Sequence, residues 1–295
     1  MRISQGLALT MLFPAAVFAQ TAAPAAPTLG QKIAAARPDL NRMNQAFQYV
    51  EAQALAESLI PAEKPAFDKS TGNATRLSTQ NYADLCQAYF LAFQAADNLG
   101  QWEKGLDYLN KALDVAKDNV AQGKESLTEQ RDYWAKTAKI YRDLLDKNAD
   151  AIKALHAKTK LEDYEEGPMN QVKTWEKDAA DGEKWNKFFQ YYLDMANRTV
   201  EDFQKFVTLQ DKKIKDQQAD IDGYKPHPGD KAKWVDAVVS NKSYLEAYAD
   251  KADKIALLYR LTVLDPDSHK ARHTLDVVLG KASPEPEKPA PKKRK

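Results

Sequence analysis

The chain has 295 residues, of which 29% are charged, and its formal net charge is +1. This length allows one or two domains with hydrophobic cores of their own. The near-neutral charge argues against a nucleic-acid-binding protein, because such proteins carry a clear basic excess. A single cysteine, Cys86, excludes an internal disulfide. We expect it to be buried as a small apolar residue, with a reactive thiol as the alternative.

The N-terminus has the pattern of an export signal. Residues 1–19 start with a basic residue, Arg2, continue as an apolar run and end in Val17-Phe18-Ala19, a small-x-small cleavage pattern. This pattern predicts a cleavable signal peptide and a periplasmic or secreted protein. No segment reaches the ~20 apolar residues that a transmembrane helix needs. Residues 20–38, rich in Ala, Pro and Thr, are predicted to form a flexible leader.

The first predicted helices lead into a helical hairpin. A helix is expected from Asp39 to Ile60, followed by a loop to residue 77 and a helix capped by Ser78 or Thr79. This helix enters a hairpin over residues 89–113. Gly100 is placed at the turn, because glycine adopts positive φ readily.

The second half of the chain is predicted to be helical as well. A seven-residue apolar repeat predicts one helix over 126–164, with breaks after it at Gly167-Pro168 and Asp181-Gly182. An aromatic stripe beginning at Trp185 is interpreted as core, with a ligand surface as the alternative. Two prolines and two glycines predict a loop at 223–229.

Helices are then expected from Asp230 and from Ser243, and a last helix capped by Asp267 or Ser268 ends near Gly280. The tail over 282–295 is predicted to be disordered, and its local charge of about +3 would allow weak contact with a membrane or cell wall. No segment keeps the two-residue alternation of a strand, so the predicted fold class is all-α. We expect an N-terminal helical region over 39–165 and a C-terminal one over 166–281.

The hairpin resembles one tetratricopeptide repeat over about residues 86–119. Its turn glycine, aromatic, small and large apolar residues follow that family's order, and an aromatic of the first helix fits too: Gly100, Trp102, Gly105, Leu109, Ala112 and Tyr89. Phe93 and Lys117 depart from the pattern. The resemblance implies antiparallel helical hairpins stacked as a right-handed array, here with some longer helices.

The same resemblance implies a groove that binds a peptide or protein partner. Its lining would come from the first helix of the repeat, at Gln87, Phe90, Gln94, Asp97 and Asn98. Because the sequence shows no catalytic constellation, we expect no catalytic residue, metal or cofactor. The predicted function is a non-enzymatic interaction scaffold of the bacterial cell envelope, of unknown oligomeric state.

Two alternatives remain open from the sequence. His269 and His273 share one face of the last helix, where Asp265, Asp267 or Asp276 could complete a metal site in an envelope enzyme. The long helices expected at 126–164 and 184–222 could instead form a coiled-coil oligomerisation unit.

Overall fold

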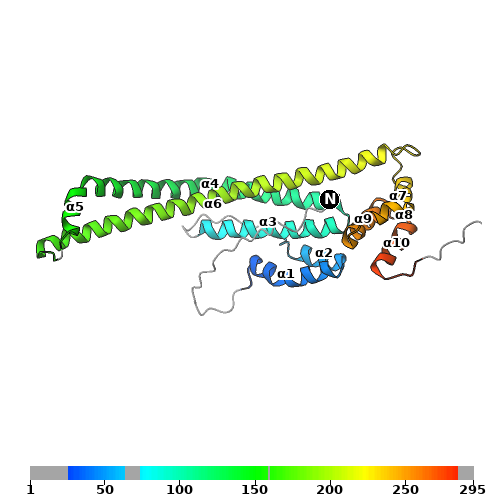
Figure 1. Cartoon of the computed structure of the whole chain (residues 1–295), viewed down its shortest axis with the longest axis horizontal. Coiled ribbons are helices and arrows are strands. Elements are labelled where there is room, and N and C mark those ends of the chain that lie inside the picture. The colour runs from blue at the N-terminus through cyan, green and yellow to red at the C-terminus, as the bar shows by residue number, and fades with distance from the viewer. Residues whose placement is uncertain (1–25, 64–73, 159, 285–295) are drawn as a thin grey trace, which may run out of the picture. The chain divides into compact units, whose positions relative to one another are not determined.

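The computed structural model describes residues 26–63, 74–158 and 160–284, with backbone alone for 74–79. It confirms the all-α fold: these ranges contain ten helices and no strand (Figure 1). None of those helices is long and apolar enough to cross a bilayer. The predicted signal peptide and most of the predicted tail lie outside the described ranges. The helices are α1 Leu29–Gln45, α2 Tyr49–Ser58, α3 Ala74–Asn98, α4 Trp102–Lys147, α5 Ala149–His156, α6 Asp163–Asp222, α7 Lys231–Ser240, α8 Lys242–Glu246, α9 Lys251–Leu264 and α10 His269–Leu279.

The chain divides into two compact units that alternate along the sequence. Unit 1 comprises Met1–Pro61, Gln87–Leu109 and Val207–Lys295, and unit 2 comprises Ala62–Cys86 and Asn110–Phe206. Helices α3, α4 and α6 each run from one unit into the other. The division expected between residues 165 and 166 falls inside α6.

The leader prediction is wrong for residues 29–38, which are the first part of α1. Thr28 and Gln31 form a capping box, in which the Thr28 hydroxyl accepts from Gln31 N at 3.2 Å and Gln31 Oε1 accepts from Thr28 N at 2.9 Å. Such a box satisfies two backbone donors that a helix start leaves unpaired. Pro38 is tolerated inside α1, where Ile33 is only 1% exposed, so burial of the apolar stripe outweighs one lost backbone hydrogen bond.

Three helix boundaries differ from the predictions for local reasons. The helix expected over 39–60 is two helices, separated at Phe47, whose φ is +58°. Helix α3 begins at Ala74 rather than at a Ser78 or Thr79 cap. The helix expected from Ser243 is divided into α8 and α9, because the Asp250 side chain accepts from Ala252 N at 2.7 Å and starts a new helix.

The long helices run through the predicted breaks. Helix α4 joins the second helix of the hairpin to the helix expected from residue 126, and α6 contains both Pro168 and Gly182. Gly182 is close to a neighbouring backbone, since a Cβ there would lie 2.8 Å from Ala138 N in α4. The glycine therefore allows a close crossing of the two helices inside unit 2 instead of ending one of them.

The loop before α7 and the two ends of α10 agree with the predictions. Residues 223–229 are outside regular helix, and Asp230 caps α7 by accepting from Lys233 N at 3.0 Å. Ser268 caps α10, and Gly280 ends it with a φ of +76°.

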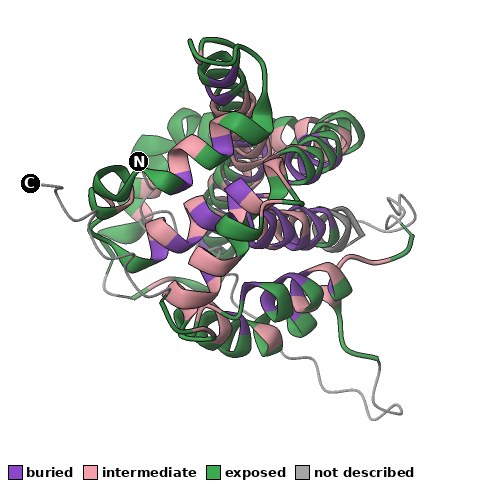
Figure 2. Ribbon diagram, turned by 90° about the vertical axis from the view of Figure 1, so that its right-hand side faces the viewer, coloured by how far each residue is buried: buried purple, intermediate pink, exposed green. Residues whose placement is uncertain are grey.

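The core of unit 1 consists of two apolar clusters. One gathers α7, α9 and α10 around Ile255, Leu258 and Leu261, each 0% exposed. The other packs α1 and α2 against α3 around Ile33 and Ala88. In most helices the buried residues form a stripe along one side, while the opposite side is exposed (Figure 2). This is the pattern of amphipathic helices, which turn one apolar side to the core and a polar side to the solvent.

Candidate protein-binding surface

The five predicted groove residues lie on the part of α3 that belongs to unit 1. Gln94 is exposed, while Gln87, Phe90, Asp97 and Asn98 are half-buried. The Phe90 ring centroid lies 5.6 Å from that of Phe93 on the same helix. The prediction that these residues bind a partner stays open.

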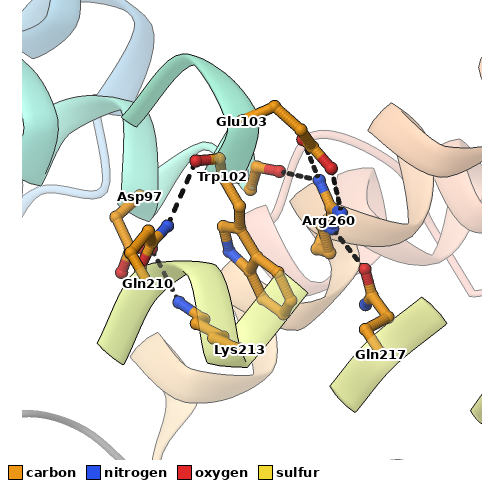
Figure 3. A network of polar contacts seen from close by, with 8 residues as sticks. Asp97, Trp102, Glu103, Gln210, Lys213, Gln217 and Arg260 are labelled. Atoms are coloured by element: carbon orange, nitrogen blue, oxygen red, sulfur yellow. Dashed lines mark hydrogen bonds and ion pairs between the residues drawn. The ribbon is translucent and has the colours of Figure 1, made fainter. Parts of the chain in front are cut away.

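Two of these side chains take part in the packing of unit 1. Asn98 Nδ2 donates to Asn44 Oδ1 in α1 at 3.4 Å. Asp97 Oδ1 accepts from Lys213 Nζ at 2.6 Å and from Gln210 Nε2 at 3.1 Å, both in α6 (Figure 3). A peptide would have to replace these bonds, so Asp97 is a structural residue in this conformation.

Beside Asp97 lies a polar network centred on the buried Arg260 of α9. This side chain is 2% exposed and donates to both carboxylate oxygens of Glu103 at 2.7 Å. It also donates to Gln217 Oε1 at 2.7 Å and to the Gly100 carbonyl at 2.9 Å. The pKa of the Glu103 carboxyl is lowered mainly by its hydrogen bonds from Arg260. Four directed bonds leave this guanidinium satisfied as a structural link rather than available to a ligand.

Trp102 completes the same network (Figure 3). The Arg260 guanidinium carbon lies 4.3 Å from the centre of the Trp102 ring, and Lys213 Nζ lies 4.1 Å from it. Cations held this close to an indole are attracted by its electron-rich face. These contacts join the tight turn at Gly100 to α6 and α9. The motif residues Gly100 and Trp102 therefore have a role in packing.

Sequence reasoning missed Arg260. It lies in α9 between two fully buried leucines, Leu258 and Leu261. A charged residue next to such a stripe is a signal of a buried ion pair. Its partner, Glu103, lies 157 residues away, so the pairing itself was not visible.

The other candidate chemistry is not assembled in the described residues. His269 is exposed and His273 is half-buried, and no three His, Cys, Asp or Glu side chains in the described ranges lie close enough to hold a metal ion. Cys86 is 4% exposed with its Sγ 3.5 Å from the Ala112 carbonyl oxygen, which confirms the prediction of burial.

The more prominent surface is on unit 2, where α4 and α6 run alongside each other in opposite directions (Figure 1). We call residues 127–147 of α4 and 172–193 of α6 the arm. Trp134 stacks on Trp185 with ring centroids 6.1 Å apart. Seven residues further along α4, the nearby Asp178 carboxylate of α6 raises the pKa of Tyr141. The two contacts are seven residues apart on both helices, so the pair keeps one register, as in a coiled coil.

One side of the arm is polar and crosslinked. Arg142 forms an ion pair with Glu183 at 2.8 Å, and Arg131 Nη1 donates to Gln190 Oε1 at 3.2 Å. Asn186 Nδ2 donates to the Arg131 carbonyl at 3.1 Å. These bonds join α4 to α6 along one side of the contact between the two helices, which we call the polar side.

The opposite side of the arm is aromatic and partly open to solvent. Its rings form a continuous cluster from α4 to α6, with neighbouring centroids 4.7 to 6.3 Å apart. The members are Tyr133, Trp134, Trp185, Phe188, Phe189, Tyr191 and Tyr192. Tyr133 and Tyr191 are 59% and 57% exposed, and Ile140, seven residues after Tyr133, is 58% exposed. We name this surface the aromatic side.

The stripe at Trp185 is therefore core only in part. Tyr192 is 8% exposed, as the core interpretation predicts, whereas Trp185 is 36% exposed. The hollow between the two helices, next to Leu127 and Leu193, has a volume of about 10 Å³. That is room for one water molecule, so this part of the arm offers a surface for docking rather than a ligand cavity.

Comparison with protein-family models, curated proteins and solved structures returned no match for this chain.

Proposed function

We propose that this chain is a non-enzymatic protein-interaction scaffold of the bacterial cell envelope, and that it binds its partner through the aromatic side of the arm. The observation that carries the proposal is the cluster of exposed large apolar residues there, Tyr133, Ile140 and Tyr191. The largest exposed apolar patch of a soluble protein is often functional, which favours a binding role for this one. Tyrosine and tryptophan are also the residues that dominate the energetics of protein interfaces.

The envelope location rests on the export pattern of residues 1–19. The tetratricopeptide resemblance of residues 86–119 also favours a binding role, but its predicted groove is a weaker candidate than the arm. Asp97 and Asn98 already have hydrogen-bond partners within unit 1. On the aromatic side the exposed rings of Tyr133 and Tyr191 pack edge-on against the neighbouring rings of Trp134 and Tyr192. A partner that covers the exposed parts of these two rings would displace water.

Photo-crosslinking in the native envelope tests this proposal. A photoreactive phenylalanine analogue replaces Tyr133 on the aromatic side, and in a matched strain it replaces Lys139, which is exposed on the polar side of α4. We expect a discrete protein adduct from position 133 and none from position 139. Equal labelling at the two positions, or no adduct at either, would show that the aromatic side is not a binding surface.

A further inference from the structure

We propose that the partner on the aromatic side is a second copy of this chain, whose arm packs against the first to form a four-helix bundle. This inference rests on the proposed binding role of the aromatic side and names its partner. Three observations support it: the course of α3 within unit 2, the exposed apolar area, and the charge of the arm.

Within unit 2, α3 packs against the beginning of α4. It contacts the same side of α4 that bears Tyr133 and Ile140 further along the helix. The contact is between Cys86 and Ala112, and Tyr133 and Ile140 follow Ala112 at multiples of seven residues. In a helix pair that keeps a heptad register, such positions share one side. Helix α3 begins only 12 residues before Cys86, at Ala74. Because both helices rise equally per residue, the start of α3 lies beside about residue 124 of α4. Helix α3 therefore does not reach Tyr133.

The aromatic side beyond that point thus continues a surface that already packs against a helix. A helical hairpin with one open apolar side is half of a four-helix bundle, in which each helix contacts two neighbours. The arm supplies two of these helices. An identical arm, which has the same uncovered side, supplies the other two.

The exposed apolar area is a substantial part of what a stable dimer buries. Tyr133, Ile140, Tyr191 and Trp185 are 36% to 59% exposed, which corresponds to roughly 400 Å² of side-chain surface per copy. Half-buried neighbours, such as Trp134, Phe188 and Leu144, add to this area. A standard interface buries ~800 Å² per partner, so the four exposed residues alone supply about half of it.

The charge of the arm also fits a second copy. Its two helices carry nine basic and eight acidic residues, so the arm is close to neutral. A near-neutral arm meets little net repulsion from a copy of itself. It also has no charge excess that would select a strongly acidic or basic partner. When two identical sides are related by a two-fold axis, each covers the other. No uncovered copy of the surface is left to add a third chain.

Sedimentation equilibrium of the purified full chain tests this inference, with Ile140→Glu as the disruptive variant and Lys139→Glu as its control. The two positions are adjacent and both exposed, but only Ile140 lies on the aromatic side. We expect a species of twice the chain mass for the wild type and for Lys139→Glu. Ile140→Glu should dissociate at least about 100-fold more readily, because it buries a carboxylate without a partner. Circular dichroism should show the same helix content in all three proteins, and Tyr191→Lys repeats the test on α6.

A wild-type monomer at concentrations up to about 100 μM would overturn the second copy as partner. Equal dimerisation of Ile140→Glu and Lys139→Glu would do the same, because it would place the interface elsewhere. The crosslinking experiment separates this failure from failure of the binding role. An adduct of Tyr133 with a different protein, together with a monomeric chain, would keep the scaffold function and remove the second copy. An adduct of twice the chain mass supports both.

Discussion

Replacing Gly100 with alanine should destabilise the protein for two separable reasons. Gly100 has a φ of +68°, a conformation that side-chain-bearing residues rarely adopt. A Cβ at this position would also lie 2.3 Å from Arg260 Cα and 2.4 Å from Arg260 N. Both neighbouring atoms belong to the backbone of α9, which cannot rotate away as a flexible side chain would.

The two reasons have different sizes. The left-handed conformation costs a residue with a Cβ about 1 kcal/mol. Relief of the contact requires α9 to move by about 1 Å or more, since carbon atoms pack at ~3.5–4.0 Å. Overpacking of this kind costs about 1–3 kcal/mol, and the shift also weakens the bond from Arg260 to the Gly100 carbonyl. We therefore expect Gly100→Ala to lower the free energy of unfolding by about 2–4 kcal/mol in total.

Gly280→Ala is the matched control, because Gly280 has a φ of +76° but no described atom within 4 Å of the position that a Cβ would occupy. It should lose only the conformational part, about 1 kcal/mol. Urea unfolding followed by circular dichroism and tryptophan fluorescence measures both variants. Equal losses in the two variants would refute the close approach of Gly100 to α9.

Three further predictions concern other parts of the chain. Gly182→Ala should lower the free energy of unfolding by about 1–3 kcal/mol, seen as an earlier urea midpoint, because its Cβ would lie 2.8 Å from Ala138 N. Arg260 lowers the pKa of Glu103 below its ordinary value of 4.5, so the stabilisation is present above that pH and is lost as the pH falls below it. The stability difference between wild type and Glu103→Gln should therefore be smaller at about pH 3 than at about pH 7, and urea midpoints at both pH values check this. Burial raises the pKa of Tyr248 from 10.0 to about 12, so the protein should lose stability as the pH rises between these values. Tyr248→Phe should reduce that loss, and phenolate absorbance checks the titration itself.

The sequence was sufficient for the fold class and for boundaries that depend on local chemistry. The absence of strand alternation predicts an all-α chain, and the loop at 223–229 follows from two prolines and two glycines. The cap at Ser268 and the helix end at Gly280 are likewise set by side chains and φ preferences within one turn. The capping box of Thr28 and Gln31 was equally legible, but the Ala- and Pro-rich composition around it suggested a flexible leader.

Boundaries that depend on packing could not be predicted in this way. Gly182 has the local preference of a helix break, yet its environment is the backbone of Ala138, 44 positions earlier in the chain. The candidate site shows the same limit. Motif spacing selected Asp97 for a groove, whereas its ion pair with Lys213 spans 116 residues. A local sequence pattern shows that such residues are unusual. Only the fold shows which distant group each of them contacts.

The aromatic stripe on α6 shows how far sequence and structure together can go. A helix that packs against a single neighbour needs only a narrow apolar seam, about two positions in seven. Around Trp185 the apolar positions are wider than that seam, since Phe188, Phe189 and Tyr192 follow within two turns. This width by itself predicts contact on more than one side. The arm supplies contact on one side through α4, and the exposure of Trp185 shows that another side is only partly covered. The surplus of aromatic surface is the physical reason to expect a second helical hairpin there, and a monomer that keeps these rings in water would contradict it.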